Sequence, residues 1–126
     1  MVEYDKERRD ANGLRIGRIG HCDWDLVTNA MIWSPGLYSI FQQNPYGTET
    51  LGLTHFLKWF HADDRPNATN LIWLALDSRQ LQEGRYRIVL ATDMIRNVSL
   101  LAEPALNERG EAVRMCLTLV ELTEAT

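Results

Sequence analysis

The sequence predicts a single α+β domain, in which five antiparallel strands form a sheet and helices cover one of its faces. Three observations support this fold class. Apolar and polar residues alternate in the first third of the chain and again from residue 85 onward, which is the period of a half-buried strand. The middle of the chain has the period of an amphipathic helix. With 126 residues, the chain is long enough for one shared core.

Residues 2–12 have the pattern of a short polar helix. Asp5 and Arg9 stand four positions apart, which favours an ion pair along a helix, and Asn12-Gly13 is a typical helix stop. Because few apolar side chains lie here, this helix would be marginal alone. We therefore divide the chain into a flanking helix over residues 1–13, which we expect to contact the domain or a second copy, and a domain over residues 14–126.

A hairpin is expected next. Cys22, Trp24 and Leu26 share one face of a strand, with polar residues on the other face. Thr28-Asn29 is expected to turn the chain, since asparagine tolerates a positive φ. A second strand then carries Met31 and Trp33.

Three helices are expected in the middle of the chain. Ser34-Pro35 begins the first, because serine caps free amides and proline suits the first turn. Residues 53–60 form the second. The third has apolar residues at helical spacing and is expected to end near Glu83-Gly84; those residues are Ala68, Leu71, Ile72, Ala75 and Leu76. Three further strands follow, around residues 85–90, 97–103 and 113–119.

The stretch HADDR, residues 61–65, suggests either a metal site or a junction between two helices. A metal site would need His61, Asp63 and Asp64 to face one ion, and no second cluster supplies further ligands. We therefore assign no metal site. We predict that Asp63 or Asp64 caps the long helix and that Arg65 pairs with a neighbouring acid.

The composition excludes several classes of protein. A net charge of −4 is unfavourable for nucleic-acid binding, which needs clustered Lys and Arg. No apolar run approaches the roughly 20 residues that a membrane span needs. The two cysteines, Cys22 and Cys116, do not form a disulfide framework, so a reducing cytoplasm is expected.

Taken in order, five segments resemble PAS domains, in the subgroup whose middle reads W-S … H-P-D-D-R. They are GHCDWDLVTNAMIWS, LYSIF, FLKWFHADDR, YRIV and VELTE, and the likeness runs from about Ile19 to Thr123. Ala62 replaces the usual proline. Met94 follows Asp93 where the family has Asp-Gly, so we expect the turn to be longer or shifted. Glu121 replaces an aspartate and lengthens its arm.

The resemblance implies a sensory module that is not itself an enzyme. Such domains precede an output domain, such as the histidine kinase of a two-component system or a nucleotide cyclase, and often form homodimers. They hold haem, flavin or a small metabolite between sheet and helices, or hold nothing. We expect the wall of that space to comprise Met31, Trp33, Phe56, Leu71 and Ala75. We expect Glu121 and Thr123 to couple the last strand to whatever follows it.

The cofactor stays undetermined, although two groups are disfavoured. Residues 64–81 lack a histidine for haem, and no segment resembles the Asn-Cys-Arg motif of photoactive flavin domains. Cys22 is expected in the core; a contact with Cys116, which would make a redox switch, is an alternative.

Three functions remain open. The first is a cytoplasmic PAS sensor of a small ligand. The second is a ligand-free module for protein–protein interaction, chiefly homodimerisation. The third, ranked last, is a small enzyme with a cone-like α+β fold. No Ser-His-Asp set or carboxylate pair faces inward by periodicity, so no catalytic residue is assigned.

Overall fold

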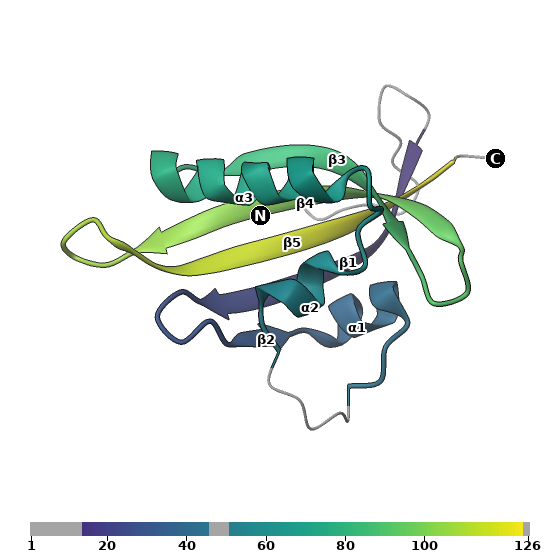
Figure 1. The fold of residues 1–126 in the computed structure, drawn as a ribbon, viewed down its shortest axis with the longest axis horizontal. Helices are drawn as coiled ribbons and strands as arrows, with labels where there is room; N and C mark the ends of the chain where they lie inside the picture. Colours follow the sequence, from purple (N-terminus) through teal and green to yellow (C-terminus); the bar gives the residue numbers. More distant parts are fainter. Residues whose placement is uncertain (1–13, 46–50, 125–126) are drawn as a thin grey trace.

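The computed structural model describes residues 14–45 and 51–124 and confirms the predicted α+β class (Figure 1). Its five strands form one antiparallel sheet in the order β2-β1-β5-β4-β3. The elements are β1 (Leu14–Asp25), β2 (Met31–Trp33), α1 (Pro35–Phe41), α2 (Leu53–Leu57), α3 (Arg65–Ser78), β3 (Gln82–Val89), β4 (Ile95–Leu106) and β5 (Ala112–Glu124). The flanking helix predicted for residues 1–13 lies outside the described residues.

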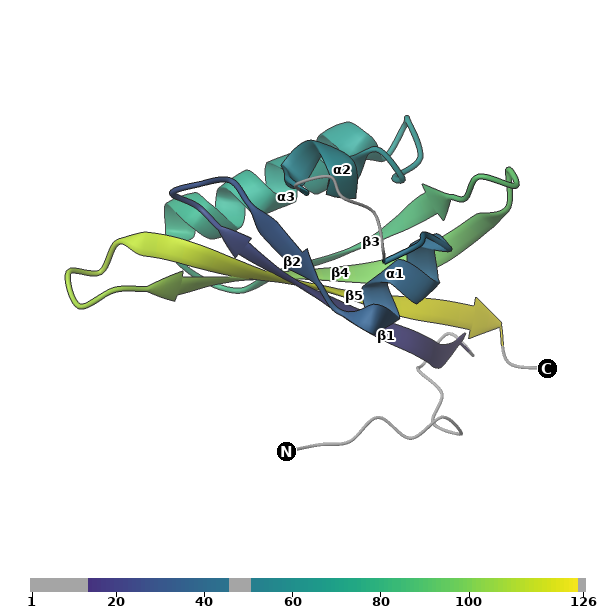
Figure 2. The same cartoon turned by 90° about the horizontal axis from the view of Figure 1, so that it is seen from below.

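One hydrophobic core lies between the sheet and the helices. Figure 2 shows α2 and α3 on the same side of the sheet. The inner residues of β5, Met115, Leu117 and Leu119, are fully buried, whereas Cys116 between them is exposed. The helices bury Leu37, Ile40, Phe41, Phe56, Ala68, Ile72 and Ala75 against the same core. No helix in the described ranges is long and apolar enough to cross a membrane.

The first hairpin follows the predicted chemistry. Cys22 pairs with Trp33 across β1 and β2, and Asn29 in the turn has a φ of 64°. The carboxylate of Asp25 accepts hydrogen bonds from the backbone N–H groups of Val27 and Thr28, at 2.9 and 3.2 Å. β1 begins earlier than predicted, because its first residues pair with the last residues of β5.

Helix α1 packs directly on the backbone of β1. The Ser34 hydroxyl accepts a hydrogen bond from the Leu37 N–H at 3.3 Å, as its predicted capping role requires. Gly20 makes the close contact with α1: a Cβ atom there would lie 2.5 Å from the backbone nitrogen of Leu37. A side chain on this position of β1 would therefore displace the helix.

Two helix ends differ from the prediction. α3 ends at Ser78, followed by Arg79 with a φ of 56°, and not near Glu83-Gly84, which lie within β3. Gly84 provides space, since a Cβ atom there would lie 2.6 Å from the Tyr86 hydroxyl oxygen. α2 ends at Leu57 rather than at residue 60, because the next residues join the edge of β3: the Val89 N–H donates to the Trp59 carbonyl at 2.7 Å.

Of the two expected alternatives, a longer or a shifted turn, the connection between β3 and β4 is the longer one. The Leu90 N–H donates to the Met94 carbonyl at 2.9 Å, and the Asp93 N–H donates to the Leu90 carbonyl at 2.8 Å. Asp93 takes the positive φ, 63°. Aspartate tolerates this conformation better than a methionine would, which explains how the chain turns without the Asp-Gly pair.

Candidate functional site

The HADDR stretch is a structural junction between α2, α3 and β3. Asp64 lies at the N-cap position of α3, but its side chain makes no capping hydrogen bond, so the predicted cap by this residue is wrong. Its carboxylate instead accepts three hydrogen bonds from Arg87 on β3: from the backbone N–H at 2.8 Å, from Nε at 2.9 Å and from Nη2 at 2.8 Å. A two-pronged, charge-assisted pair is stronger than a bond to one exposed amide.

The same contact changes the acidity of both groups. Hydrogen bonds from the Arg87 side chain lower the pKa of Asp64 to about 2, against the opposing effect of desolvation. The Asp64 carboxylate in turn raises the pKa of Arg87. The pair is therefore ionised throughout the neutral range.

Two further HADDR side chains, those of His61 and Arg65, form hydrogen bonds within the junction. Arg65 donates to the carbonyl groups of Leu57, Lys58 and Phe60, at 3.0–3.2 Å, rather than to the acids beside it. It therefore caps the end of α2, which corrects the predicted ion pair. Nδ1 of His61 accepts from the Asp63 N–H at 3.0 Å. Within the described residues, no cluster of His, Cys, Asp and Glu has an arrangement suited to a metal ion.

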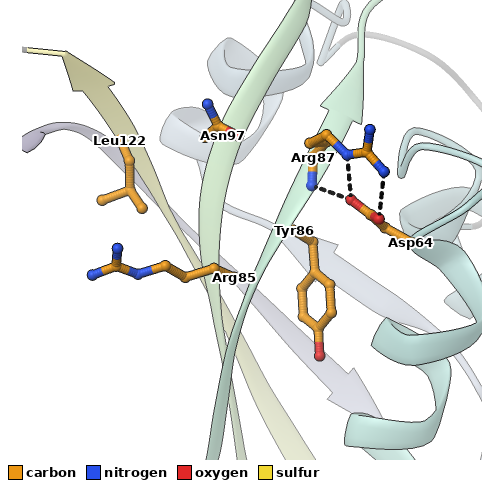
Figure 3. A pocket seen from close by; sticks show the side chains of 6 residues that line it. All are labelled: Asp64, Arg85, Tyr86, Arg87, Asn97 and Leu122. Carbon is orange, nitrogen blue, oxygen red and sulfur yellow. Dashed lines mark hydrogen bonds and ion pairs between the residues drawn. The ribbon is translucent and has the colours of Figure 1, made fainter. Parts of the chain in front are cut away.

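A depression of about 490 Å³ lies beside this junction (Figure 3). Among the described residues, its lining comprises Asp64, Arg85, Tyr86, Arg87, Asn97 and Leu122. Figure 3 shows Arg87 turned toward Asp64, whereas Arg85 extends away from this pair toward Leu122. Three neighbouring strands and the start of α3 contribute these residues. Alternation along β3 puts Arg85 and Arg87 on the side opposite Ile88, which is buried, but no sequence pattern brings Asp64 to Arg87.

The predicted pocket wall lies in the layer between sheet and helices. Met31, Trp33, Phe56 and Ala75 are buried, and Leu71 is half-buried against the same core. The structure therefore brings these five residues into one core, from β2, α2 and α3. Whether they enclose a ligand stays a prediction.

An aromatic cluster, which sequence reasoning identified only in part, extends this wall. The ring of Trp33 lies 5.2 Å from that of Tyr38 and 5.3 Å from that of Phe41. Phe41 in turn contacts Phe56 at 5.9 Å and stacks with Trp59 at 6.3 Å. The Nε1 donor of Trp33 is buried and has no hydrogen-bond partner. Phe41 has the helical spacing that predicts the apolar face of α1, together with Leu37 and Ile40, whereas Tyr38 was missed.

The last strand carries a buried carboxylate. Glu121 is 4% exposed and lies on the face of β5 that carries Leu117 and Leu119. Oε1 lies 4.0 Å from Nε of Arg18, and Oε2 lies 3.6 Å from Nη1 of Arg96. Oε2 is buried and accepts no hydrogen bond.

Thr123, the second residue predicted to couple this strand to a following segment, is half-buried. It pairs with Arg15 at the start of β1. The two predicted coupling residues thus both lie near the C-terminal end of β5. Their coupling role stays a prediction.

The two cysteines lie on opposite faces of the sheet. Cys22 pairs in register with Leu117, so the neighbouring Cys116 side chain points away from it. Cys22 is fully buried and Cys116 is exposed. Burial raises the pKa of the Cys22 thiol to about 12. Core packing of Cys22 is confirmed, and the alternative of a contact between the thiols is wrong, because alternation separates them.

No model of a known protein family matches the chain. A probable diguanylate cyclase of Escherichia coli, DgcE, is 27% identical over 111 residues, covering 86% of this chain and 10% of that protein. The chain thus spans about a tenth of the length of this curated relative.

Several solved structures share the fold of this chain. A sensory box histidine kinase/response regulator from Burkholderia thailandensis superposes with a TM-score of 0.66 and 23% identity, over 82% of this chain and 76% of that chain. The N-terminal domain of a diguanylate cyclase with PAS/PAC sensor from Marinobacter aquaeolei gives 0.71 and 12%, over 82% and 94%. A PAS domain from Colwellia psychrerythraea gives 0.65 and 14%, over 82% and 85%. The strand order, the covering helices and these superpositions agree: the chain has the PAS fold.

Proposed function

We propose that this chain is a PAS sensory module that passes a signal to an output domain, either a histidine kinase or a nucleotide cyclase, in the cytoplasm. The observation that carries the proposal is the PAS fold together with the 27% identity to a segment of a diguanylate cyclase. The domain itself performs no catalysis in this proposal. Its signal is a shift between two packings of sheet and helices.

The aromatic cluster supports a small-molecule ligand. A buried donor without a partner costs about 1–3 kcal/mol, so the indole N–H of Trp33 favours an occupant that offers an acceptor. The surrounding rings favour an apolar or planar body. We therefore propose an uncharged molecule with a carbonyl or ether oxygen, bound between Trp33 and the wall formed by Met31, Phe56, Leu71 and Ala75.

Native mass spectrometry of freshly purified protein tests this proposal. We expect a bound small molecule in the unchanged chain and its loss in Trp33→Phe, which keeps an aromatic side chain but removes the N–H donor. Trp73→Phe is the matched control, because Trp73 is 50% exposed on α3 and should leave the bound mass in place. In a full-length protein, Trp33→Phe should alter the output. A ligand-free mass together with unchanged output in Trp33→Phe would refute ligand sensing.

Ligand-free homodimerisation is the second candidate, favoured by the outer face of the sheet. Two apolar side chains alternate with core residues of the sheet and are exposed: Ile32 on β2 at 71% and Ile95 on β4 at 55%. Exposed apolar side chains on this face suit contact with a second copy of the chain. Native mass spectra distinguish the two candidates, because ligand-free homodimerisation requires the mass of a dimer without a bound molecule.

A further inference from the structure

The buried carboxylate of Glu121 connects three strands of the sheet. Arg18 approaches it from β1 and Arg96 approaches it from β4, at 4.0 and 3.6 Å. Both contacts are longer than a hydrogen bond, and Oε2 accepts none. Removing an ion from water is costly unless strong hydrogen bonds replace those to water. A small shift of either arginine toward Glu121 would therefore form a hydrogen bond to this carboxylate.

The guanidinium of Arg18 also holds helix α1. Its Nη1 donates to the carbonyl oxygen and to the hydroxyl oxygen of Ser39, both at 3.0 Å. Ser39 lies between the buried residues Leu37 and Phe41 of α1. Because Phe41 contacts Trp33, Phe56 and Trp59, a movement of the aromatic cluster moves the segment that Arg18 holds.

A β-bulge in β1 places Arg18 between Ser39 of α1 and Glu121 of β5. Ile16 pairs with Leu122 and Ile19 pairs with Val120, so Gly17 and Arg18 together lie opposite Glu121. The extra residue directs Arg18 toward α1. Gly17 provides the space for the longer arm of glutamate, since a Cβ atom there would lie 2.8 Å from Oε1 of Glu121.

We infer that Arg18 is a positioning residue that links helix α1, through Ser39, to the carboxylate of Glu121 near the end of β5. A displacement of α1 then changes the ion pair at the end of the last strand, with the Gly17–Arg18 bulge as the joint. The linkage is a property of the fold. Its use in signalling rests on the proposed sensory function.

Amide NMR spectra of the full chain test the linkage through Glu121→Gln, which keeps the shape but removes the charge. We expect the amide resonances of Ser39, Ile40 and Phe41 and the indole resonance of Trp33 to shift. Asp23→Asn is the matched control, because Asp23 pairs with Arg114 at 2.8 Å on the outer face of the same sheet. Its effects on α1 should be several-fold smaller. Unmoved α1 resonances in a folded Glu121→Gln protein would overturn the inference.

The reciprocal experiment uses Ser39→Ala, a mild change that removes one of the two acceptors. We expect the amides of Val120, Glu121 and Leu122 to shift, and the shifts in the Ser39→Ala/Glu121→Gln double variant to be smaller than the sum of the single effects. Arg18→Lys should resemble Ser39→Ala, since one ammonium cannot reach Ser39 and Glu121 together. Strict additivity in the double variant would count against a shared element.

The role of Gly17 is tested by rescue. Gly17→Ala should lower the unfolding midpoint and shift the α1 amides, and Glu121→Asp, with its shorter arm, should diminish both effects of the alanine. If Gly17→Ala lowers the unfolding midpoint equally with Glu121 and with Glu121→Asp, then Gly17 does not serve to make room for the glutamate. Native mass spectra keep this test separate from the proposed function: a protein without ligand can still show the linkage, and a ligand-binding protein can lack it.

Discussion

At the scale of single residues, Asp64 illustrates how a partner distant in sequence replaces a local role. An acid at the start of a helix is a good N-cap candidate from sequence alone. In the fold, β3 brings Arg87 within reach, and the carboxylate binds its side chain and its backbone N–H together. The capping bond is absent, because the carboxylate is turned toward Arg87 and the Asp64 backbone, with φ −94° and ψ −19°, lacks the extended conformation of a typical N-cap.

We predict that Asp64→Asn destabilises the domain by about 1–2 kcal/mol at pH 7. The lowered pKa, from 3.8 to about 2, corresponds to an upper estimate of about 2 kcal/mol, which we reduce because the Arg87 side chain is 41% exposed to solvent. Since folding depresses this pKa, the contribution is complete above about pH 4 and is lost as the pH falls toward 2. Urea unfolding at pH 7, 4 and 2.5 measures the effect.

The gap in unfolding free energy between the unchanged protein and Asp64→Asn should therefore narrow at pH 2.5. Asp23→Asn is the control, because that carboxylate is 53% exposed and its surface pair with Arg114 should contribute little. A gap that stays constant from pH 7 to 2.5 would show that the ion pair is not the source of the stability.

At the scale of elements, the docking of α1 on β1 depends on the absence of a side chain. At Gly20, an added Cβ would meet the backbone of Leu37, which has no rotamer by which to move away. The helix and the strand would have to separate, and with them the contacts of Leu37, Ile40 and Phe41 with the core.

We predict that Gly20→Ala destabilises the domain by about 3 kcal/mol, the upper range for overpacking. Gly110→Ala is the comparison: Gly110 has a φ of 79° with open space around it, so only a conformational cost of about 1 kcal/mol is expected. Chemical denaturation of both variants measures the difference. Equal midpoints for the two variants would mean that α1 shifts at little cost.

At the scale of the whole molecule, the described elements share one hydrophobic core. A single hydrophobic cluster contains residues from every strand and every helix of the described ranges. No element can leave this cluster without exposing apolar surface that the others share. Small domains built in this way unfold in one step.

We predict that urea unfolding followed by tryptophan fluorescence and by far-ultraviolet circular dichroism gives the same midpoint. Trp24 and Trp33 report on the core, whereas the dichroism reports on helices and sheet. Two separated transitions, with fluorescence changing first, would indicate that the hairpin and α1 unfold before the rest of the sheet.

Sequence patterns alone predicted most of the fold. Alternation identified the buried residues of β1 and β5, Asn29 predicted the first turn, and Ser34-Pro35 predicted the start of α1. These signals succeed because burial periodicity and turn conformation depend on neighbours in the chain. The five wall residues also lie in the core, as expected, although the contribution of Tyr38 was not foreseen.

Only the tertiary structure determined the partners. Asp64 and Arg87 are 23 positions apart, and Arg18, Arg96 and Glu121 come from three different strands. Their contacts depend on strand register and on one bulge, since a shift of one residue would move each side chain to the other face of the sheet. Gly84 shows the same limit: a residue expected to end a helix instead provides space within a strand. Periodicity assigns a side chain to one face of the sheet, whereas strand register determines which residues lie next to it.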